Sequence, residues 1–214
     1  MKVLFIGHYK EFGGWSRAAI DYILAMDSVG IEVVCRNISL TAHHKEPPKR
    51  ILDLEDNDTL NCDICIQNLL PHHLIGSGHF KKNVALYFSE SQGIKSIPWF
   101  VNLQQMDEVW VPNSDMRNIL VADKLMDGDR IKLLPCPSDL SVFSKTYKEI
   151  TIPEINHKFK FYYIGDLNDR KNLGSLVRSF HSEFDKSEPV ALILKVWKFG
   201  LSPEQTHNHV HGMF

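Results

Sequence analysis

The sequence predicts an α/β fold in which a Rossmann-like parallel sheet is followed by an incomplete second Rossmann-like unit. Short apolar runs of strand length alternate with longer amphipathic segments, and polar or glycine-bearing loops follow the runs. This alternation is typical of parallel strands joined by crossover helices. The chain has 214 residues, of which 43% are hydrophobic, so it is long enough for one large or two small globular domains.

The first predicted domain covers residues 1–143. It begins with a strand at residues 3–6, a glycine-bearing turn and a helix whose apolar face includes Ile20 and Ile23. Asn113 is placed to cap a later helix, because its side-chain oxygen can accept a first-turn amide. The charged, proline-containing residues 41–58 favour a surface crossover or loop. Further strands are expected at residues 31–35, 64–66, 84–88, 108–111 and 131–134.

A polar, charged linker is expected at residues 144–158, and the second unit at residues 159–214. This unit begins with a strand at 159–164, continues with an apolar helical face that includes Val177, and has a strand at 190–196. Beyond Lys198 the chain is polar and histidine-rich, and we expect disorder there. Because parallel strands are found covered on both faces, this second unit is predicted to be incomplete.

Charge and hydropathy exclude two classes of function. With 24 Lys and Arg against 26 Asp and Glu, the net charge of -2 gives no basic field to attract nucleic acid. The first apolar run stops at Gly7, unlike an export signal. No run approaches the roughly 20 apolar residues of a membrane-spanning helix. We therefore expect a cytoplasmic protein with no nucleic-acid partner and no transmembrane segment.

The four cysteines are too few to form a disulfide scaffold at this length. Cys62 and Cys65 have the spacing of redox and zinc motifs, but no second pair occurs. The strand pattern around Cys65 would also point the two thiols to opposite faces. The sequence favours reduced, buried thiols over a redox or metal role.

Candidate site residues lie in loops after predicted strands, because ligands bind outside the carboxyl ends of parallel strands. Gly13 and Gly14 follow the first strand and would let the backbone approach a ligand closely, although a plain tight turn is an equal alternative. Glu90 follows the strand at 84–88, and a solvated loop carboxylate is its alternative. A histidine cluster surrounds another strand end, where ordinary loop histidines are the favoured interpretation: His72, His73 and His79.

Three stretches resemble the GT-B glycosyltransferases, specifically the retaining group called family 4 or group 1. They are residues 7–17, residues 107–114 together with 134–143, and residues 161–172. The resemblance covers most of the chain, and it implies that residues 1–143 are the acceptor-side domain and residues 159–214 the truncated start of the nucleotide-sugar-binding domain. It implies transfer of a sugar, with retention, from a nucleotide-sugar donor to a carbohydrate, lipid or protein acceptor. It also implies that no metal or other cofactor is needed, and that Glu90 lies where family members present acceptor-binding or catalytic side chains.

The resemblance places Lys171, assisted by Arg170, at the donor diphosphate. The amino end of a helix already favours an anion, and a departing diphosphate needs cations and amide donors. Two departures from the family pattern stand out. Asp166 follows Gly165 where many members have arginine, and the family's glutamate pair for the donor would lie beyond Phe214, so the donor site is expected to be truncated.

Two alternatives stay open. An NADP-dependent oxidoreductase would use Arg36 on a 2′-phosphate, although Gly7, Gly13 and Gly14 do not give the G-x-G-x-x-G spacing. A non-catalytic or degenerate sugar-binding or interaction module would instead use the uncovered second unit to contact a protein partner that completes it. Peripheral membrane contact is compatible with either interpretation. The alternating His207, His209 and His211 would share a face for metal binding only in an extended tail.

Overall fold

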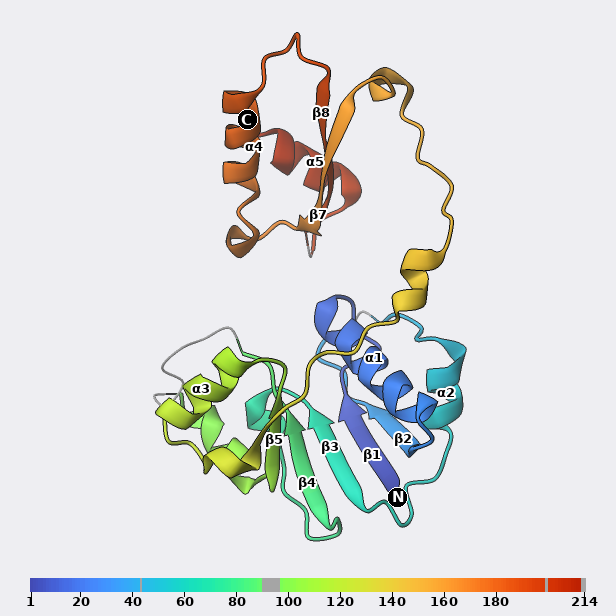
Figure 1. Cartoon of the computed structure of the whole chain (residues 1–214), viewed down its shortest axis with the longest axis vertical. Helices are drawn as coiled ribbons and strands as arrows, with labels where there is room; N and C mark the ends of the chain where they lie inside the picture. Colours follow the sequence, from blue (N-terminus) through green and yellow to red (C-terminus); the bar gives the residue numbers. More distant parts are fainter. Residues whose placement is uncertain (43, 90–96, 199, 213–214) are drawn as a thin grey trace. The chain divides into compact units, whose positions relative to one another are not determined.

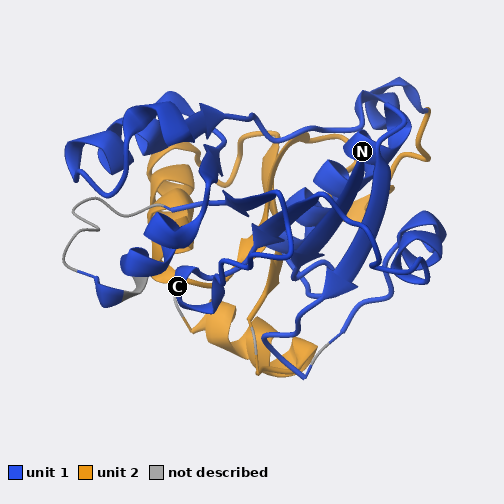
Figure 2. Ribbon diagram, turned by 90° about the horizontal axis from the view of Figure 1, so that it is seen from below, with its two compact units in different colours: residues 1–145 blue, residues 146–214 orange. Residues whose placement is uncertain are grey.

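The computed structural model describes residues 1–42, 44–89, 97–198 and 200–212 (Figure 1). The chain divides into two compact units, which Figure 2 colours separately: unit 1, Met1–Lys145, and unit 2, Thr146–Phe214. Each unit has parallel strands accompanied by helices. Along the described part of the chain, no helix combines the length and apolar character required to cross a membrane.

Unit 1 contains a six-stranded parallel sheet of order β2-β1-β3-β4-β5-β6, which confirms the Rossmann-like prediction. Gly7 at the end of β1 pairs with Asn37 of β2 on one side and with Asn68 of β3 on the other. The strand order reverses direction at the β1–β3 boundary, which is the position where open α/β sheets bind ligands. The strands are β1 (Lys2–Gly7), β2 (Glu32–Asn37), β3 (Ile64–Asn68), β4 (Lys82–Leu86), β5 (Glu108–Val111) and β6 (Ile131–Leu133).

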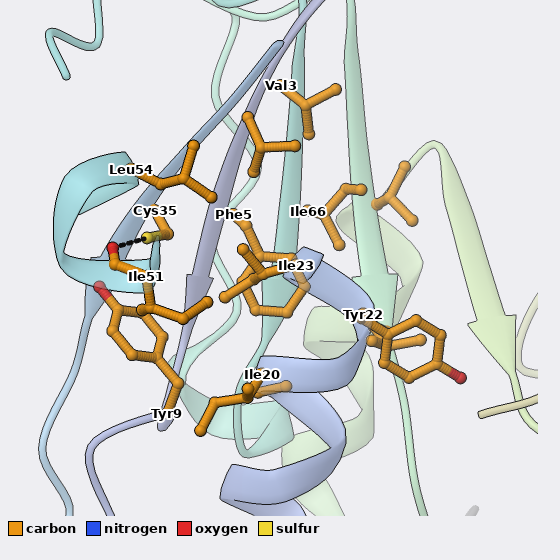
Figure 3. Packing of buried hydrophobic residues seen from close by; sticks show 14 residues of the cluster. Val3, Phe5, Tyr9, Ile20, Tyr22, Ile23, Cys35, Ile51, Leu54 and Ile66 are labelled. Atoms are coloured by element: carbon orange, nitrogen blue, oxygen red, sulfur yellow. Dashed lines mark hydrogen bonds between the residues drawn. The ribbon is translucent and has the colours of Figure 1, made fainter. Parts of the chain in front are cut away.

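Helices pack on both faces of this sheet because the strand side chains alternate. Val3 and Phe5 point to the face covered by α1 (Gly14–Ser28) and α2 (Lys49–Glu55), as Figure 3 shows. Ala85 and Val109 point to the opposite face, which packs against α3 (Ser114–Ala122) and η3 (Pro98–Gln105). The connections on either side of the β1–β3 boundary therefore leave toward different faces.

Residues 41–58 lie in the crossover from β2 to β3, and helix α2 forms there, so of the two expectations for this segment the loop is wrong. Ile51 and Leu54 are spaced three residues apart, so one helical turn brings both onto the same side. Both are buried with Cys35 of β2, and the Cys35 thiol donates to the Ile51 carbonyl at 3.5 Å (Figure 3). Two buried side chains thus fix a short helix inside a segment whose composition is otherwise typical of a loop.

Cys62 and Cys65 lie in a single cluster with Leu4 and Val34, so the expected opposite orientation of the two thiols is wrong. The reason is local: β3 starts only at Ile64, and Asn61 has a φ of 59°, so Cys62 precedes the pleat that sets side-chain direction. Burial raises the pKa of Cys65 to about 12, which favours the unreactive thiol.

Unit 2 contains a two-stranded parallel sheet of β7 (Phe159–Asp166) and β8 (Val190–Trp197), with α4 (Leu173–Glu183) between them in the chain. The expected disorder beyond Lys198 is wrong, because α5 (Pro203–His211) forms there. Ser202 and Gln205 make a reciprocal capping box at its start, and Thr206 is buried. Besides η3, the described residues include the short helices η1 (Pro71–His73), η4 (Gly128–Arg130), η5 (Leu140–Ser144), η6 (Pro153–Ile155) and η7 (Asp169–Lys171).

Candidate functional site

His8 follows β1 directly and is the first polar side chain at the β1–β3 boundary; it is only 1% exposed. Its Nδ1 lies 2.5 Å from the Ile38 carbonyl oxygen. A carbonyl can only accept, so Nδ1 carries the proton and Nε2 presents a lone pair. Burial lowers the pKa of His8, opposed by the Ile38 hydrogen bond and by Glu11, while His73 lowers it further. Within the described residues, the buried Nε2 has no hydrogen-bond partner.

Asn68, at the end of β3, and Trp15, in the first turn of α1, carry two more buried polar atoms. Asn68 is fully buried, and its Nδ2 donates to the Leu86 carbonyl at 3.0 Å, which identifies Oδ1 as the other amide atom. The Trp15 ring stands edge-on to His8, with 5.4 Å between ring centroids and an interplanar angle of 79°. Asn68 Oδ1 and Trp15 Nε1 are both buried and make no hydrogen bond to the residues that the structure describes.

Glu11 fixes the loop that holds His8. Its Oε1 accepts from the Leu40 and Thr41 amides at 2.7 and 3.2 Å, and its Oε2 accepts from the Thr41 hydroxyl at 2.7 Å. Burial alone would raise the pKa of Glu11, but these hydrogen bonds outweigh it and lower the pKa. The ionised carboxylate thereby secures the residues just after Ile38, whose carbonyl sets the His8 tautomer.

Gly13 and Gly14 lie at the start of α1, in the turn that follows β1. Gly13 is the N-cap residue with φ of 108°, a left-handed conformation that a side chain would strain. As an N-cap, glycine supplies no side-chain oxygen to the first-turn amides. The two glycines therefore leave the amino end of α1 open to an approaching group, beside Trp15 in the first turn.

The other residues predicted in unit 1 have varied surroundings. Glu90 lies outside the described residues. His72 and His73 are exposed on η1, with ring centroids 4.0 Å apart, and His79 is exposed in the following loop. Arg36 donates to the carbonyl oxygens of Cys35, Glu55 and Asn57, so its guanidinium is already engaged with backbone and no observation favours its use on a 2′-phosphate.

Unit 2 contains a pocket of about 350 Å³ at the amino end of α4. Asn172, the N-cap of α4, has a φ of 51° and leads into Leu173 and Gly174. Lys198 and His209 of α5 also line the pocket, and the Lys198 ammonium lies 3.4 Å from His209 Nε2. The pocket thus combines helix-start amides, a cation and an imidazole. It is lined by Leu167, Asn168, Asp169, Asn172, Leu173, Gly174, Lys198 and His209.

Lys171 and Arg170 lie on η7, immediately before α4 and outside the set of described residues that line the pocket. The Lys171 amide donates to Asn168 Oδ1 at 3.1 Å, so the backbone of this turn is fixed. Asp166 accepts a hydrogen bond from Asn168 Nδ2 at 2.9 Å. Asp166 therefore helps to fix the turn that leads to α4.

Sequence reasoning missed His8, Asn68 and Lys198. It considered His209 only as a metal ligand in an extended tail, and residues Pro203–His211 form a helix instead. A polar residue at the end of a buried strand could have indicated His8 and Asn68, since strand ends meet at one edge of the sheet. His209 enters the pocket only because α5 forms. Among the described side chains, no group of three or more His, Cys, Asp or Glu is arranged to hold a metal ion.

Comparison with known proteins gives structural neighbours only. No family model matches the sequence, and no curated protein matches it. Two solved structures of variants of the wall teichoic acid polymerase TagF, one soaked with CDPG, align with TM-scores of 0.45 and 0.44, each at 11% identity. The alignments cover 100% and 92% of this chain but 59% and 56% of those proteins. At this level the likeness assigns no activity to the chain.

Proposed function

We propose that the chain is part of a glycosyltransferase that moves a sugar from a nucleotide-sugar donor to a carbohydrate, lipid or protein acceptor, with retention and in the cytoplasm. Two independent lines support it. The first is the resemblance of three separated stretches to retaining GT-B enzymes. The second is the unit 2 pocket, which carries the proposal because it presents the kind of groups that a leaving diphosphate requires.

The chemistry of the pocket fits a diphosphate. Breaking the bond between the sugar and the diphosphate leaves negative charge on the phosphate oxygens, which amide donors and cations stabilise. The first amides of α4 point toward its amino end, where the helix dipole adds partial positive charge. Lys198 supplies a full charge beside these amides, and because an ammonium can only donate, His209 Nε2 accepts from it and helps to position it. Asp169 opposes the anion, so the cations have to outweigh one carboxylate.

Lys171 remains part of the proposal through its position on the turn before α4. A lysine side chain is long and flexible, so it can reach an anion from a neighbouring turn. Its contribution is expected to be smaller than that of Lys198, which lines the pocket directly. Arg170, on the same turn, is the second cation that would compensate for Asp166.

The test is binding of UDP-glucose and GDP-mannose by saturation-transfer NMR, followed by titration. We expect Lys198→Ala to weaken binding of the preferred donor by about tenfold, the loss of one charged contact to phosphate. Lys171→Ala should weaken it less, and Lys186→Ala, which removes an exposed lysine in the loop after α4, serves as the matched control. Unchanged affinity in Lys198→Ala would contradict the assigned donor site.

One observation favours an interaction module as a second candidate. In unit 2, apolar side chains of both strands are exposed: Tyr162 is 76% exposed, Ile164 59% and Trp197 50%. Exposed apolar groups gathered on one sheet are typical of interfaces. Light scattering after size exclusion would test this candidate. If the interaction module is correct, the chain should form a stable complex that Ile164→Asp disrupts, and it should bind no nucleotide sugar. A monomer that binds the donor would contradict this candidate.

A further inference from the structure

We propose that a second copy of this chain pairs with the outer edge of β7, so that two unit 2 sheets join into one four-stranded sheet. The two β7 strands run antiparallel, with Tyr163 at the centre of the contact. This inference goes beyond sugar transfer and does not rest on it, because none of the described residues that line the pocket at the start of α4 lies within residues 160–166. It gives the exposed sheet of unit 2 a defined partner.

The outer edge of β7 presents unpaired backbone groups. In the described part of unit 2, the sheet consists of β7 and β8. The amides of Phe159 and Leu167, near the two ends of β7, both donate to carbonyls on the β8 side. Because backbone direction alternates along a strand, the odd-numbered residues of β7 face β8 and the even-numbered residues face away from it. No described residue hydrogen-bonds to the outward backbone groups of Lys160, Tyr162 and Ile164.

A two-fold axis determines how one β7 meets another. Two identical strands related by an axis perpendicular to the sheet run antiparallel, and each contact between residues i and j occurs twice. With the axis at Tyr163, Tyr162 lies opposite Ile164 of the second copy, and Lys160 lies opposite its Asp166. All four positions are even-numbered, so their outward N–H and C=O groups meet as hydrogen-bonded pairs. The paired side chains also point to the same face.

The charges favour this register and a second copy as the partner. A lysine on an edge strand ordinarily opposes pairing, but Lys160 here meets a carboxylate at each end of the contact. The Asp166 carboxylate accepts from Asn168 Nδ2 at 2.9 Å and has lone pairs left for an ammonium. A shift by two residues in either direction moves Lys160 opposite Ile164 or Asn168. In one of these shifts Asp166 meets Lys158, which precedes β7 and lies outside the ladder.

The apolar side chains of the outer face find partners in the same register. Tyr162 and Ile164 are both exposed, and an aromatic residue directly opposite a β-branched residue forms a favourable cross-strand pair. Helix α4 packs on the other face, where Phe161 contacts Phe180 and Phe184 with ring centroids 5.9 and 5.4 Å apart. Pairing at the edge therefore leaves the contacts of α4 in place. An open, apolar edge of eight residues is a template for strand addition.

Size-exclusion chromatography with light scattering, over a series of concentrations of the full chain, provides the test. We expect a dimer whose fraction rises with concentration. Lys160→Glu and Asp166→Lys each place like charges opposite each other and should weaken the dimer roughly tenfold or more. The control Lys186→Glu, in the exposed loop after α4, should leave it unchanged. An equimolar mixture of the two weakened variants should restore the dimer, because opposite charges then meet at both ends.

Trp197→Ser distinguishes edge pairing from stacking of the exposed faces. Trp197 pairs with Asp166 and shares its face, but it lies on β8, away from the contact between the two copies. The dimer should therefore survive this change. If Asp166→Lys does not fold, Tyr162→Pro replaces it, because proline removes an outward N–H and no bond to β8.

The remaining outcomes decide against the proposal. A chain that is monomeric at every concentration overturns it, and so does a dimer that Lys160→Glu leaves intact or that Trp197→Ser dissolves. Two weakened variants that fold but do not associate when mixed overturn the register. A monomeric chain that pairs with a strand of a different protein would show that the edge has another occupant and would also refute the second copy.

Discussion

Removal of the Glu11 carboxylate should destabilise unit 1 in a pH-dependent manner. In Glu11→Ala, the Leu40 and Thr41 amides and the Thr41 hydroxyl lose an ionised acceptor at 2.7 to 3.2 Å. A hydrogen bond to a charged group contributes about 1.5–3 kcal/mol. The three share one acceptor, and Leu40 and Thr41 are exposed enough for water to replace part of the loss. We therefore expect the free energy of unfolding to fall by about 2–3 kcal/mol at neutral pH.

The pH dependence distinguishes the carboxylate from simple packing. The pKa of Glu11 is lowered in the folded chain, so its contribution is complete above the unfolded value near 4.5 and is lost as the pH falls through the folded value. Urea unfolding followed by tryptophan fluorescence measures the difference from wild type, with Glu46→Ala as an exposed control in the neighbouring loop. A difference that stays constant below pH 4.5, or that is absent at neutral pH, would refute the reasoning.

Three further predictions concern stability. His8→Gln should remove a pH dependence of the free energy of unfolding. Because the pKa of His8 is lowered, the wild-type stability is complete above pH 6.5 and falls as the pH drops below this value. The same urea titration should show a flatter pH profile for this variant than for the control His157→Gln. Ile23→Ala empties a fully buried position between α1 and the sheet and should cost about 2–5 kcal/mol; a cost below that of an exposed substitution would be inconsistent with the packing in Figure 3. Ser202→Ala removes the capping box of α5 and should cost about 1 kcal/mol, seen as faster amide exchange in α5; unchanged exchange would argue against the cap.

The strands of both units were predictable from sequence because their signal is local. A run such as residues 3–6 is apolar at consecutive positions, since a parallel strand is buried on both faces. Asn113 was predictable for the same reason: its oxygen accepts the Met116 amide three residues away. Helices α2 and α5 were missed because a few contacts, at Ile51 or Ser202, outweigh a polar and charged composition.

The site was predictable only in part. Gly13 and Gly14 mark the turn after the first strand, and that turn does lie at the edge where the predicted ligand would bind. The tautomer of His8 depends on Ile38, which is 30 residues away in the sequence, so no local pattern shows that one ring nitrogen is held. Lys198 and His209 meet for a similar reason, through the packing of α5 near β8.

A crystal structure of the chain with UDP or GDP, chosen by the NMR experiment, tests the central claim most directly. The diphosphate should lie at the amides of Leu173 and Gly174 beside Lys198. A diphosphate bound at Gly13 and Gly14 would contradict the assigned donor site. A nucleotide that binds away from both helix starts would contradict the proposed sugar transfer.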